Sequence, residues 1–396
     1  MMKKILLLFI LSGFTIAVTS QTIRRLDNST ISSSKLTSEI NRLINAAHVT
    51  GLVVAVFNEG KPVYSNAFGY SNTETKQKLH TYTEFYGASL SKAVFATLVM
   101  KLVEEGVLDL DKPLQQYLPK PIYEYAPVTP RAWHENYTDL KNDSLYTKIT
   151  ARMCLDHTSG FPNWRFFLPD QKLRVTQEPG SRYLYSGEGL VYLQVVLEKM
   201  LNIPLDSMMK QKIFRPLGMN TSAYKWEERF EKEFCYGHDT LQKPYQKDKD
   251  NAPRSASTLE TTPDDYVKFL KGIFDHKILS AKSTAEMFSP QIRIRSMSQF
   301  GPFANKDSTT NDNIQLSYGL GWGLYKTPYG WGAFKEGHGD GFQHYTVIFP
   351  ETKSGIMIMS NSDNTESIYK ELLEIAIKDI YMPWKWEYYI PYNDKN

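Results

Sequence analysis

Cysteine and recognisable metal-binding patterns are nearly absent from this chain of 396 residues. It contains only two cysteines, Cys154 and Cys235, so a small scaffold held together by disulfides is excluded. Neither a C-x-x-C nor an H-E-x-x-H pattern occurs, and we therefore predict no metal site and no other cofactor. We expect the two cysteines to be buried, unpaired thiols, with a single disulfide as the alternative.

An excess of charge of either sign is also lacking. Lysine and arginine number 46 against 43 aspartates and glutamates, which gives a formal net charge of +3. Loss of an N-terminal signal would remove Lys3 and Lys4 and no acid, leaving 44 against 43. So balanced a composition predicts no nucleic-acid partner. With 41% hydrophobic and 13% aromatic residues, the chain is expected to form one large globular unit or two subdomains.

The N-terminal hydrophobic run is too short to be a comfortable membrane span. Lys3 and Lys4 are followed by an apolar run over 5–18 and then by small residues before Gln21. This layout is typical of a cleaved secretory signal over 1–20, with an N-terminal anchor or a buried helix as alternatives. We therefore expect an exported protein, periplasmic or secreted, without a stable membrane anchor.

Hydrophobic periodicity places strands near both ends of the chain and helices between them. After a flexible lead-in over 21–35, we expect a helix at 36–47 and a hairpin of strands at 51–57 and 61–69. The other expected elements are helices at 93–106, 189–201, 205–214 and 366–380 and strands at 316–325, 332–335, 345–349 and 354–360.

The order of these elements predicts their assembly. We expect an α/β fold of the α+β type, in which one domain over 36–396 contains a central antiparallel sheet flanked by helices. The sheet would be built from both termini, about 36–90 and 255–396. A mostly helical insertion of about 91–254 would lie between these two parts.

The motif Ser-Leu-Ser-Lys at 89–92 stands at the front of a strongly apolar segment. If that segment is a helix, Ser89 and Lys92 lie one turn apart on the same face, within reach of one another. A serine hydroxyl needs an adjacent base to act as a nucleophile, and a lysine is a base only where burial or nearby cations keep it neutral. The N–H groups of the helix N-terminus would also hold an acyl oxyanion.

Two further segments carry candidate side chains. The first is Tyr-Ser-Gly at 185–187, where Tyr185 is either a core aromatic residue or a phenol that shuttles a proton because nearby ammonium groups lower its pKa. The second is Lys-Glu-Gly-His at 335–338, which precedes an apolar strand. A lysine at a strand edge is normally solvated, but the following glycines allow a substrate backbone to approach Lys335 closely.

In this order, the three segments resemble the three boxes of the serine β-lactamase and penicillin-binding protein superfamily, and most closely its class C β-lactamase and esterase-like branch. Flanking segments agree, among them His-Thr-Ser-Gly-Phe-Pro at 157–162 and Glu-Pro-Gly at 178–180. The resemblance spans roughly 39–380. It implies a β-lactamase/transpeptidase-like fold and a serine hydrolase that works through an acyl-enzyme.

The resemblance also implies a role for each matched residue. Ser89 would attack the carbonyl, and Lys92 would accept or relay its proton. Tyr185 would act as general acid and base, with its pKa lowered by Lys92 and Lys335, and Lys335 would stabilise negative charge. The backbone N–H groups of Ser89 and His338 would form the oxyanion hole. Which group is the acylation base stays open.

Gly187, Glu336 and Gly337 are the expected substrate-binding positions, and the first two depart from the family pattern. Gly187 stands where β-lactamases commonly have an asparagine whose amide binds the acylamido group. Glu336 replaces a hydroxyl residue that helps to bind a substrate carboxylate, and like charges about 4 Å apart repel by roughly 1 to 4 kcal/mol. Either pairing with Lys335 offsets part of this repulsion, or Glu336 points away because alternate strand residues face opposite ways.

These departures favour an esterase- or peptidase-like hydrolase of a small-molecule or peptide acyl substrate that need not carry a free carboxylate. The alternative is a β-lactamase or D-alanyl-D-alanine carboxypeptidase with a substrate derived from the cell wall. A third hypothesis is a penicillin-binding sensor that acylates without turnover.

Three further features are expected to be structural. His157 is interpreted as a hydrogen-bonding residue that orders its loop, and His344 as a surface residue of a strand. The aromatic tail over 384–392 is expected to pack onto the sheet, with a carbohydrate contact as a weaker possibility.

Overall fold

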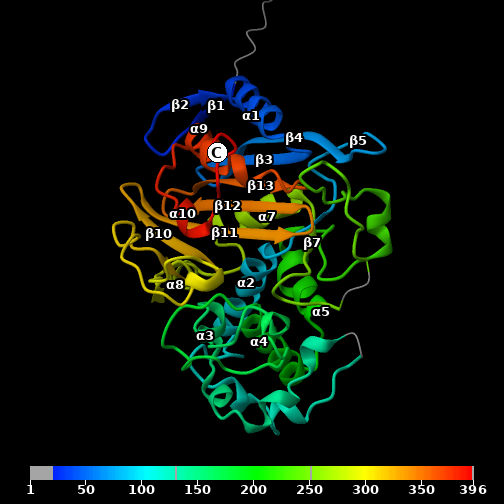
Figure 1. Ribbon diagram of the computed structural model, residues 1–396, viewed down its shortest axis with the longest axis vertical. Coiled ribbons are helices and arrows are strands. Elements are labelled where there is room, and N and C mark those ends of the chain that lie inside the picture. The colour runs from blue at the N-terminus through cyan, green and yellow to red at the C-terminus, as the bar shows by residue number, and fades with distance from the viewer. Residues whose placement is uncertain (1–20, 130–131, 250–251, 395–396) are drawn as a thin grey trace, which may run out of the picture.

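The computed structural model describes residues 21–129, 132–249 and 252–394, and the expected signal over 1–20 lies outside these ranges. A nine-stranded sheet occupies its upper part, and α3 (Ala151–Leu155) and α4 (Gly187–Leu201) lie in the lower part (Figure 1). The strand order is β5-β4-β3-β13-β12-β11-β10-β9-β8. The strands are β3 (Gly51–Asn58), β4 (Lys61–Asn72), β5 (Gln77–Lys78), β8 (Ile292–Arg293), β9 (Ser317–Tyr318), β10 (Gly323–Thr327), β11 (Gly330–Gly339), β12 (Phe342–Phe349) and β13 (Ser354–Ser360).

The N-terminal and C-terminal parts of the chain meet in the middle of this sheet. Strand β13 pairs with β3 in antiparallel register from Gly355↔Phe57 to Ser360↔Leu52. The predicted central antiparallel sheet built from both termini is therefore confirmed. The strand expected at 316–325 is instead two short strands, because the chain turns between them at Gly321, whose φ is +86°.

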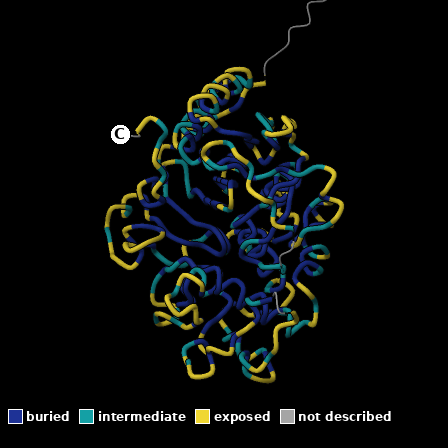
Figure 2. The backbone as a smooth tube through the Cα atoms, turned by 45° about the vertical axis from the view of Figure 1, so that its right-hand side comes forward, coloured by how far each residue is buried: buried dark blue, intermediate teal, exposed yellow. Residues whose placement is uncertain are grey.

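Alternate residues of the central strands contribute to two separate hydrophobic cores, since successive side chains of a strand point to opposite faces. On one face, α1 (Ser33–Ala47) and α9 (Glu366–Ala376) pack against the sheet. On the other face lie α2 (Leu90–Glu104) and α7 (Pro263–Phe274). Figure 2 shows the buried strands and helices inside a shell of exposed turns. The remaining helices are α5 (Leu205–Met209), α6 (Arg215–Leu217), α8 (Ala281–Met287) and α10 (Trp384–Glu387).

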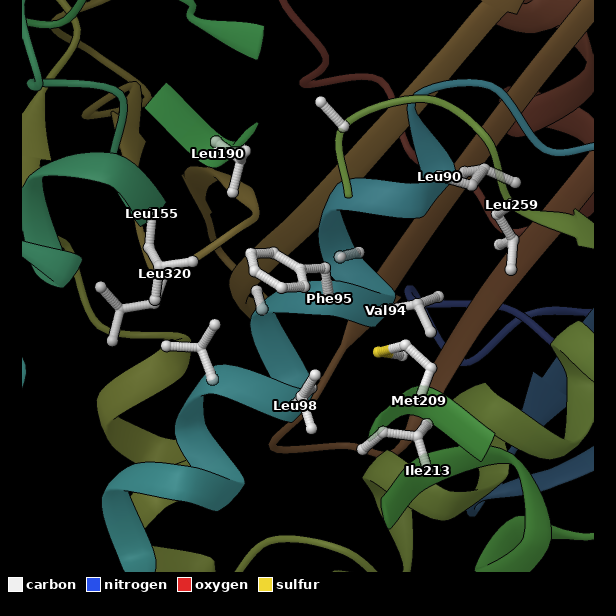
Figure 3. Close-up of a cluster of buried hydrophobic side chains, with 14 of the residues drawn as sticks. Leu90, Val94, Phe95, Leu98, Leu155, Leu190, Met209, Ile213, Leu259 and Leu320 are labelled. Atoms are coloured by element: carbon white, nitrogen blue, oxygen red, sulfur yellow. The ribbon is translucent and has the colours of Figure 1, made fainter. Parts of the chain in front are cut away.

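Helix α2 is hydrophobic on almost every side, and this composition is typical of a helix enclosed by other elements. Figure 3 shows its side chains meeting residues of α3, α4, α5 and the segments around Leu259 and Leu320. The labelled residues of α2 in that cluster are Leu90, Val94, Phe95 and Leu98. Enclosure of α2 fixes its N-terminus, where Ser89 lies, against the sheet.

Two predicted elements differ in the structure. The prediction of a flexible lead-in over 21–35 is wrong, because β1 (Thr22–Arg24) and β2 (Thr30–Ser32) form a hairpin that buries Ile23. Helix α1 then begins at Ser33, three residues before the expected start. The helix expected over 205–214 consists of α5 and a π-helical turn over Lys210–Phe214.

A short two-stranded ladder joins the two ends of the chain segment that lies between the N-terminal and C-terminal parts of the sheet. Strand β6 (Phe85–Tyr86) pairs with β7 (Glu260–Thr261) in antiparallel register. Beside this ladder, the buried Lys247 ammonium lies 2.7 Å from a Glu260 carboxylate oxygen and 3.6 Å from one of Glu84. The ladder therefore joins the strand that leads to Ser89 with a segment far along the chain.

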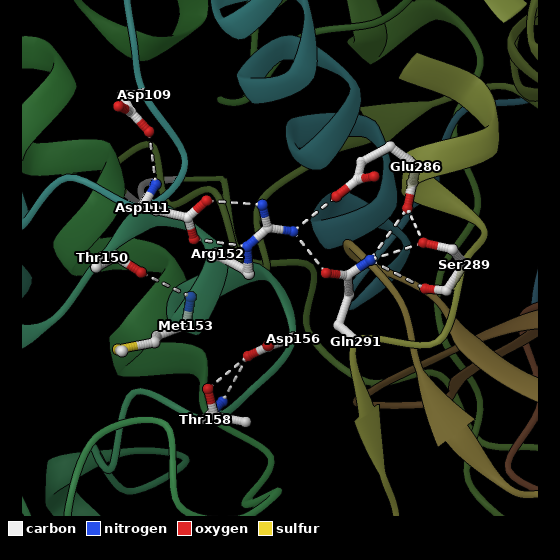
Figure 4. Close-up of polar contacts among 10 residues, drawn as sticks. All are labelled: Asp109, Asp111, Thr150, Arg152, Met153, Asp156, Thr158, Glu286, Ser289 and Gln291. Atoms are coloured by element: carbon white, nitrogen blue, oxygen red, sulfur yellow. Dashed lines mark hydrogen bonds and ion pairs between the residues drawn. The ribbon is translucent and has the colours of Figure 1, made fainter. Parts of the chain in front are cut away.

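Arg152 of α3 links the helical region to the far edge of the sheet (Figure 4). Its guanidinium donates two hydrogen bonds to Asp111, at 2.7 and 2.9 Å, and one to Glu286 at 2.8 Å. It also donates to Gln291, next to β8. Over the described ranges, no helix combines the length and the hydrophobicity needed to cross a bilayer.

Candidate active site

Ser89 and Lys92 lie together at the N-terminus of α2. Ser89 is the N-cap residue, but its hydroxyl makes no capping hydrogen bond and is free for other contacts. Lys92 Nζ lies 2.8 Å from Ser89 Oγ and donates a hydrogen bond to the Ala256 carbonyl at 2.7 Å. The predicted contact between the two side chains is present, and Ala256 is a partner that the sequence motif did not reveal.

The surroundings of Lys92 favour its neutral form. Its side chain is buried, and burial together with the nearby charge of Lys335 holds the pKa of Lys92 well below its usual range, against an opposing contribution from Glu336. A neutral amine has a lone pair that can accept the proton of Ser89. The geometry and the charge state of Lys92 therefore suit a general base.

Tyr185 lies beside both lysines. Lys335 Nζ donates a hydrogen bond to Tyr185 Oη at 3.2 Å, and Ser89 is also a hydrogen-bond partner of Tyr185. Lys92 Nζ lies 4.9 Å from the centre of the Tyr185 ring. The predicted lowering of its pKa is wrong, however, because burial raises the pKa of Tyr185 by more than the charge of Lys335 lowers it. Tyr185 is therefore a neutral phenol that is able to donate its proton.

Strand β11 presents an edge to this group of residues. Its pairing with β10 ends at Phe334↔Gly323, and among the described strands its last five residues pair with β12 alone. A Cβ at Gly337 would lie 3.0 Å from the Gly87 carbonyl oxygen and 3.2 Å from the Leu90 nitrogen. Any other residue would push the start of α2 away by a few tenths of an ångström, so glycine suits the close approach of β11, and His338 follows directly.

Glu336 lines the same cavity as Ser89 and does not point away from it. Lys335 Nζ lies 3.0 Å from Glu336 Oε1, and Gln299 Nε2 donates a hydrogen bond to that oxygen at 2.9 Å. Although burial favours the protonated acid, the Lys335 ammonium lowers the pKa of Glu336 below its usual range. Conversely, Glu336 raises the pKa of the buried Lys335 despite the opposing effect of burial. Of the two alternatives for Glu336, the structure has the pairing with Lys335.

The cavity at Ser89 has a volume of about 960 Å³. Three glutamate side chains line it, those of Glu336, Glu366 and Glu387. Aromatic side chains line other parts of it, namely Trp164, Phe167, Tyr185, Phe300, Tyr388 and Tyr389. Apart from Tyr185 and Glu336, sequence reasoning did not assign these residues to the site, because no local motif marks them.

The C-terminal tail forms part of this cavity. Trp384 and Trp386 are buried, and the ring of Trp384 packs against Tyr345 of β12 at 5.5 Å between centroids. Packing of the tail onto the sheet is thereby confirmed. Glu387 is buried as well, and the Tyr345 hydroxyl donates to its carboxylate at 2.8 and 2.9 Å. Burial and the nearby Glu336 raise the pKa of Glu387 well above its usual range.

The histidines have structural contacts. His157 Nδ1 accepts a hydrogen bond from the Ser186 N–H at 3.1 Å, which confirms its predicted role in ordering the loop before Tyr185. The prediction for His344 is wrong: it is fully buried, and its ring contacts the Tyr86 carbonyl at 2.8 Å, because β12 is covered on both faces. The side chain of His338 pairs with Glu366.

Neither cysteine is in a disulfide, and both thiols are buried, as expected. In the part of the chain that the structure describes, no cluster of three or more histidine, cysteine or acidic side chains is placed to hold a metal ion.

Comparison with known proteins agrees with this geometry. Penicillin-binding protein 4* of Bacillus subtilis is 24% identical over 353 residues, which cover 80% of this chain and 69% of the relative. A β-lactamase of Escherichia coli is 21% identical over 369 residues, which cover 82% of this chain and 87% of the relative.

Solved structures show the same fold. The octameric penicillin-binding protein homologue of Pyrococcus abyssi superposes with a TM-score of 0.66 at 22% identity, covering 89% of this chain and 80% of the other. The D-alanine carboxypeptidase AmpC of Burkholderia cenocepacia does so with a TM-score of 0.63 at 19% identity, covering 83% and 93%. The sequence also matches the β-lactamase family over residues 36–377. The chain therefore belongs to the β-lactamase family, within the serine β-lactamase and penicillin-binding protein superfamily, whose members are typically hydrolases.

Proposed function

We propose that the protein is a serine hydrolase that cleaves an ester or amide through an acyl-enzyme on Ser89, and that its substrate carries no free carboxylate next to Lys335. The observation that carries this proposal is the position of Glu336 in the cavity, 3.0 Å from Lys335. Glu336 neutralises the ammonium that would otherwise attract an anionic substrate, and its own charge repels one.

In the proposed mechanism, Lys92 accepts the proton of the Ser89 hydroxyl as Oγ attacks the substrate carbonyl. The backbone N–H groups of Ser89 and His338 hold the resulting oxyanion. Tyr185 donates its proton to the leaving oxygen or nitrogen as the bond to the acyl carbon breaks, and the proton that Lys92 took from Ser89 then passes to Tyr185, directly or through a water molecule. Lys335 stabilises the negative charge that develops near Tyr185. A water molecule then attacks the acyl-enzyme and releases the acid.

The proposal includes export and a peptide or small-molecule substrate. Export is supported by the charged and apolar N-terminal sequence over 1–20. The cavity supports a substrate of considerable size, since about 960 Å³ exceeds what a short acyl group fills. The carboxylates of Glu336 and Glu366 line it and favour a neutral or amine-bearing molecule over an anionic one, whereas the raised pKa of Glu387 favours its uncharged acid.

A β-lactamase or D-alanyl-D-alanine carboxypeptidase is the second candidate. It is favoured by the complete set of Ser89, Lys92, Tyr185 and Lys335 in mutual contact. The names of the relatives from E. coli and B. cenocepacia point in the same direction. Against it stand Glu336 and the missing amide at Gly187.

The first experiment is incubation of the protein with a fluorescent penicillin and, separately, with p-nitrophenyl acyl esters. A Ser89→Ala variant is the control for both reactions. We expect ester turnover that depends on Ser89, with slow acylation by penicillin. Rapid penicillin acylation followed by turnover would transfer the assignment to the β-lactamase candidate. Ester turnover that survives in Ser89→Ala would remove the acyl-enzyme mechanism altogether.

A further inference from the structure

An indole ring fills the space beside Gly187. A Cβ at Gly187 would lie 2.7 Å from two ring carbons of Trp164 and 2.9 Å from the Asn163 carbonyl oxygen. A side chain at this position would require both the Trp164 ring and the Asn163 backbone to shift, since real Cβ contacts are essentially never shorter than 3.0 Å. Gly187 matches the position of the asparagine that binds the acylamido group in β-lactamases. In this protein, Trp164 therefore occupies the place of that amide.

The loop that carries Trp164 is fixed to the start of α4. The Asn163 carbonyl accepts hydrogen bonds from the N–H groups of Gly187 and Glu188, both at 3.0 Å. The Arg165 guanidinium donates two hydrogen bonds to the buried Glu188 carboxylate, at 2.9 and 2.7 Å. The Arg165 N–H donates a third, at 2.9 Å. These contacts hold Trp164 in a defined position, so that it does not have to be ordered by a ligand.

Trp164 and its neighbours form an apolar wall of the cavity at Ser89. Trp164, Phe167 and Leu168 line it from one loop, and Phe300 lines it from another. The Phe300 ring packs against the Tyr185 ring at 5.2 Å between centroids. Phe167 is 68% exposed and Phe300 39%, so both rings offer apolar surface that a bound group would remove from water.

The place of this wall relative to Glu336 indicates which part of the substrate it contacts. Glu336 stands on β11 at the position that binds a substrate carboxylate in relatives, whereas Trp164 stands at the position that binds the acylamido group. The apolar wall therefore lies on the side of the acyl group. Aromatic rings bind flat apolar groups by stacking, and an indole lacks the paired amide donor and acceptor with which an asparagine side chain binds an acylamido group.

We propose that Trp164, Phe167 and Phe300 form an acyl-group subsite that selects aromatic acyl groups, such as arylacetyl groups, over small aliphatic ones. This inference rests on the proposed acyl-enzyme at Ser89. Trp164 is the residue on which selectivity depends most, because its ring is held in place before the substrate binds.

The test compares p-nitrophenyl phenylacetate with p-nitrophenyl acetate, two esters with the same leaving group. The quantity measured is the ratio of kcat/KM for the two esters, normalised to the uncatalysed hydrolysis of each. Trp164→Ala is expected to lower this ratio about tenfold, and Trp164→Phe to retain most of it. Tyr82→Ala is the control, because Tyr82 is an exposed aromatic residue that stacks on His80 and does not line the cavity. The control ratio is expected to stay within about twofold of the wild-type value.

Two results would overturn the subsite. The first is an unchanged ratio in folded Trp164→Ala, and the second is an equal fall of the ratio in the control Tyr82→Ala. If Trp164→Ala does not fold, the same ratio in Phe167→Ala decides: a fall is expected there as well, and Phe167 is exposed, so its truncation leaves no large cavity beneath the loop. Failure of the proposed function is distinct from both results, because turnover of both esters would then persist in Ser89→Ala.

Discussion

Replacement of Glu336 by glutamine isolates the effect of its charge on substrate selection. The glutamine carbonyl keeps an acceptor for Gln299 Nε2 and Lys335 Nζ, so the hydrogen bonds seen at Oε1 are retained while the negative charge is lost. The buried Lys335 then has no anionic partner at this position. We therefore expect some loss of general activity as well as a change of selectivity.

The size of the selectivity change follows from Coulomb's law. A substrate carboxylate held about 6 Å from Glu336 is repelled by about 0.7 kcal/mol at an effective dielectric of about 80, and by about 2.8 kcal/mol at about 20. These energies correspond to about 3-fold and about 100-fold in binding or acylation rate. The buried position of Glu336 favours the upper part of this range.

The assay compares acylation by benzylpenicillin with acylation by its methyl ester, which differ only in the carboxylate. Any loss of Lys335 function that follows from the missing partner lowers both acylation rates. The ratio of the rate with the acid to the rate with the methyl ester therefore reports the charge of residue 336. We expect this ratio to rise about 3- to 100-fold in Glu336→Gln. The exposed Glu351, on the turn after β12, provides a matched control in Glu351→Gln. A ratio that stays within twofold of wild type in folded Glu336→Gln would refute the argument that Glu336 excludes anions.

Three further changes test other parts of the structure. Lys92→Arg should lower the acylation rate about 10²- to 10⁴-fold, because a guanidinium stays charged and cannot accept the Ser89 proton; an acylation burst near the wild-type rate would contradict Lys92 as the base. Glu188→Gln leaves the charge of the buried Arg165 without its carboxylate partner. The free energy of unfolding, measured by urea titration, should fall by about 3 kcal/mol or more. A loss below about 1 kcal/mol would show that water solvates Arg165 instead. Burial raises the pKa of Asp379 to about 6, so the folded protein must hold a buried charge at this position once the pH rises through 6. Asp379→Asn removes that charge and should be more stable than wild type at pH 8, by up to roughly 3 kcal/mol, with a difference that shrinks towards pH 4. A difference in the free energy of unfolding that does not depend on pH would contradict this assignment.

Local sequence patterns were sufficient for the parts of the fold that depend on periodicity. The alternating and apolar runs gave β13 with its observed bounds, Ser354–Ser360, and gave β3 to within one residue. The Ser-x-x-Lys spacing placed Lys92 against Ser89, because the geometry of one helical turn is the same in every helix.

Properties that depend on tertiary burial were beyond the sequence. The raised pKa of Tyr185 results from complete enclosure of its ring, while the neighbouring charges alone predict the opposite direction. His344 was interpreted as exposed because nothing local shows that β12 lies at the centre of a covered sheet. Trp164 and Glu387 reach the cavity from a loop and from the C-terminal tail, and neither segment has a periodic pattern that fixes its path.

The ladder between β6 and β7 has a consequence for how this protein can diverge. It pairs Tyr86 with Glu260, so the ends of the long intervening segment are held together whatever its length. Doubling the length of a flexible loop adds only about 0.6 kcal/mol to the free energy of closing it. Surface loops within this segment are therefore free to lengthen, shorten and change sequence while Ser89 keeps its position beside β11. New substrate preferences can arise there by insertion and deletion, without rebuilding the reaction centre.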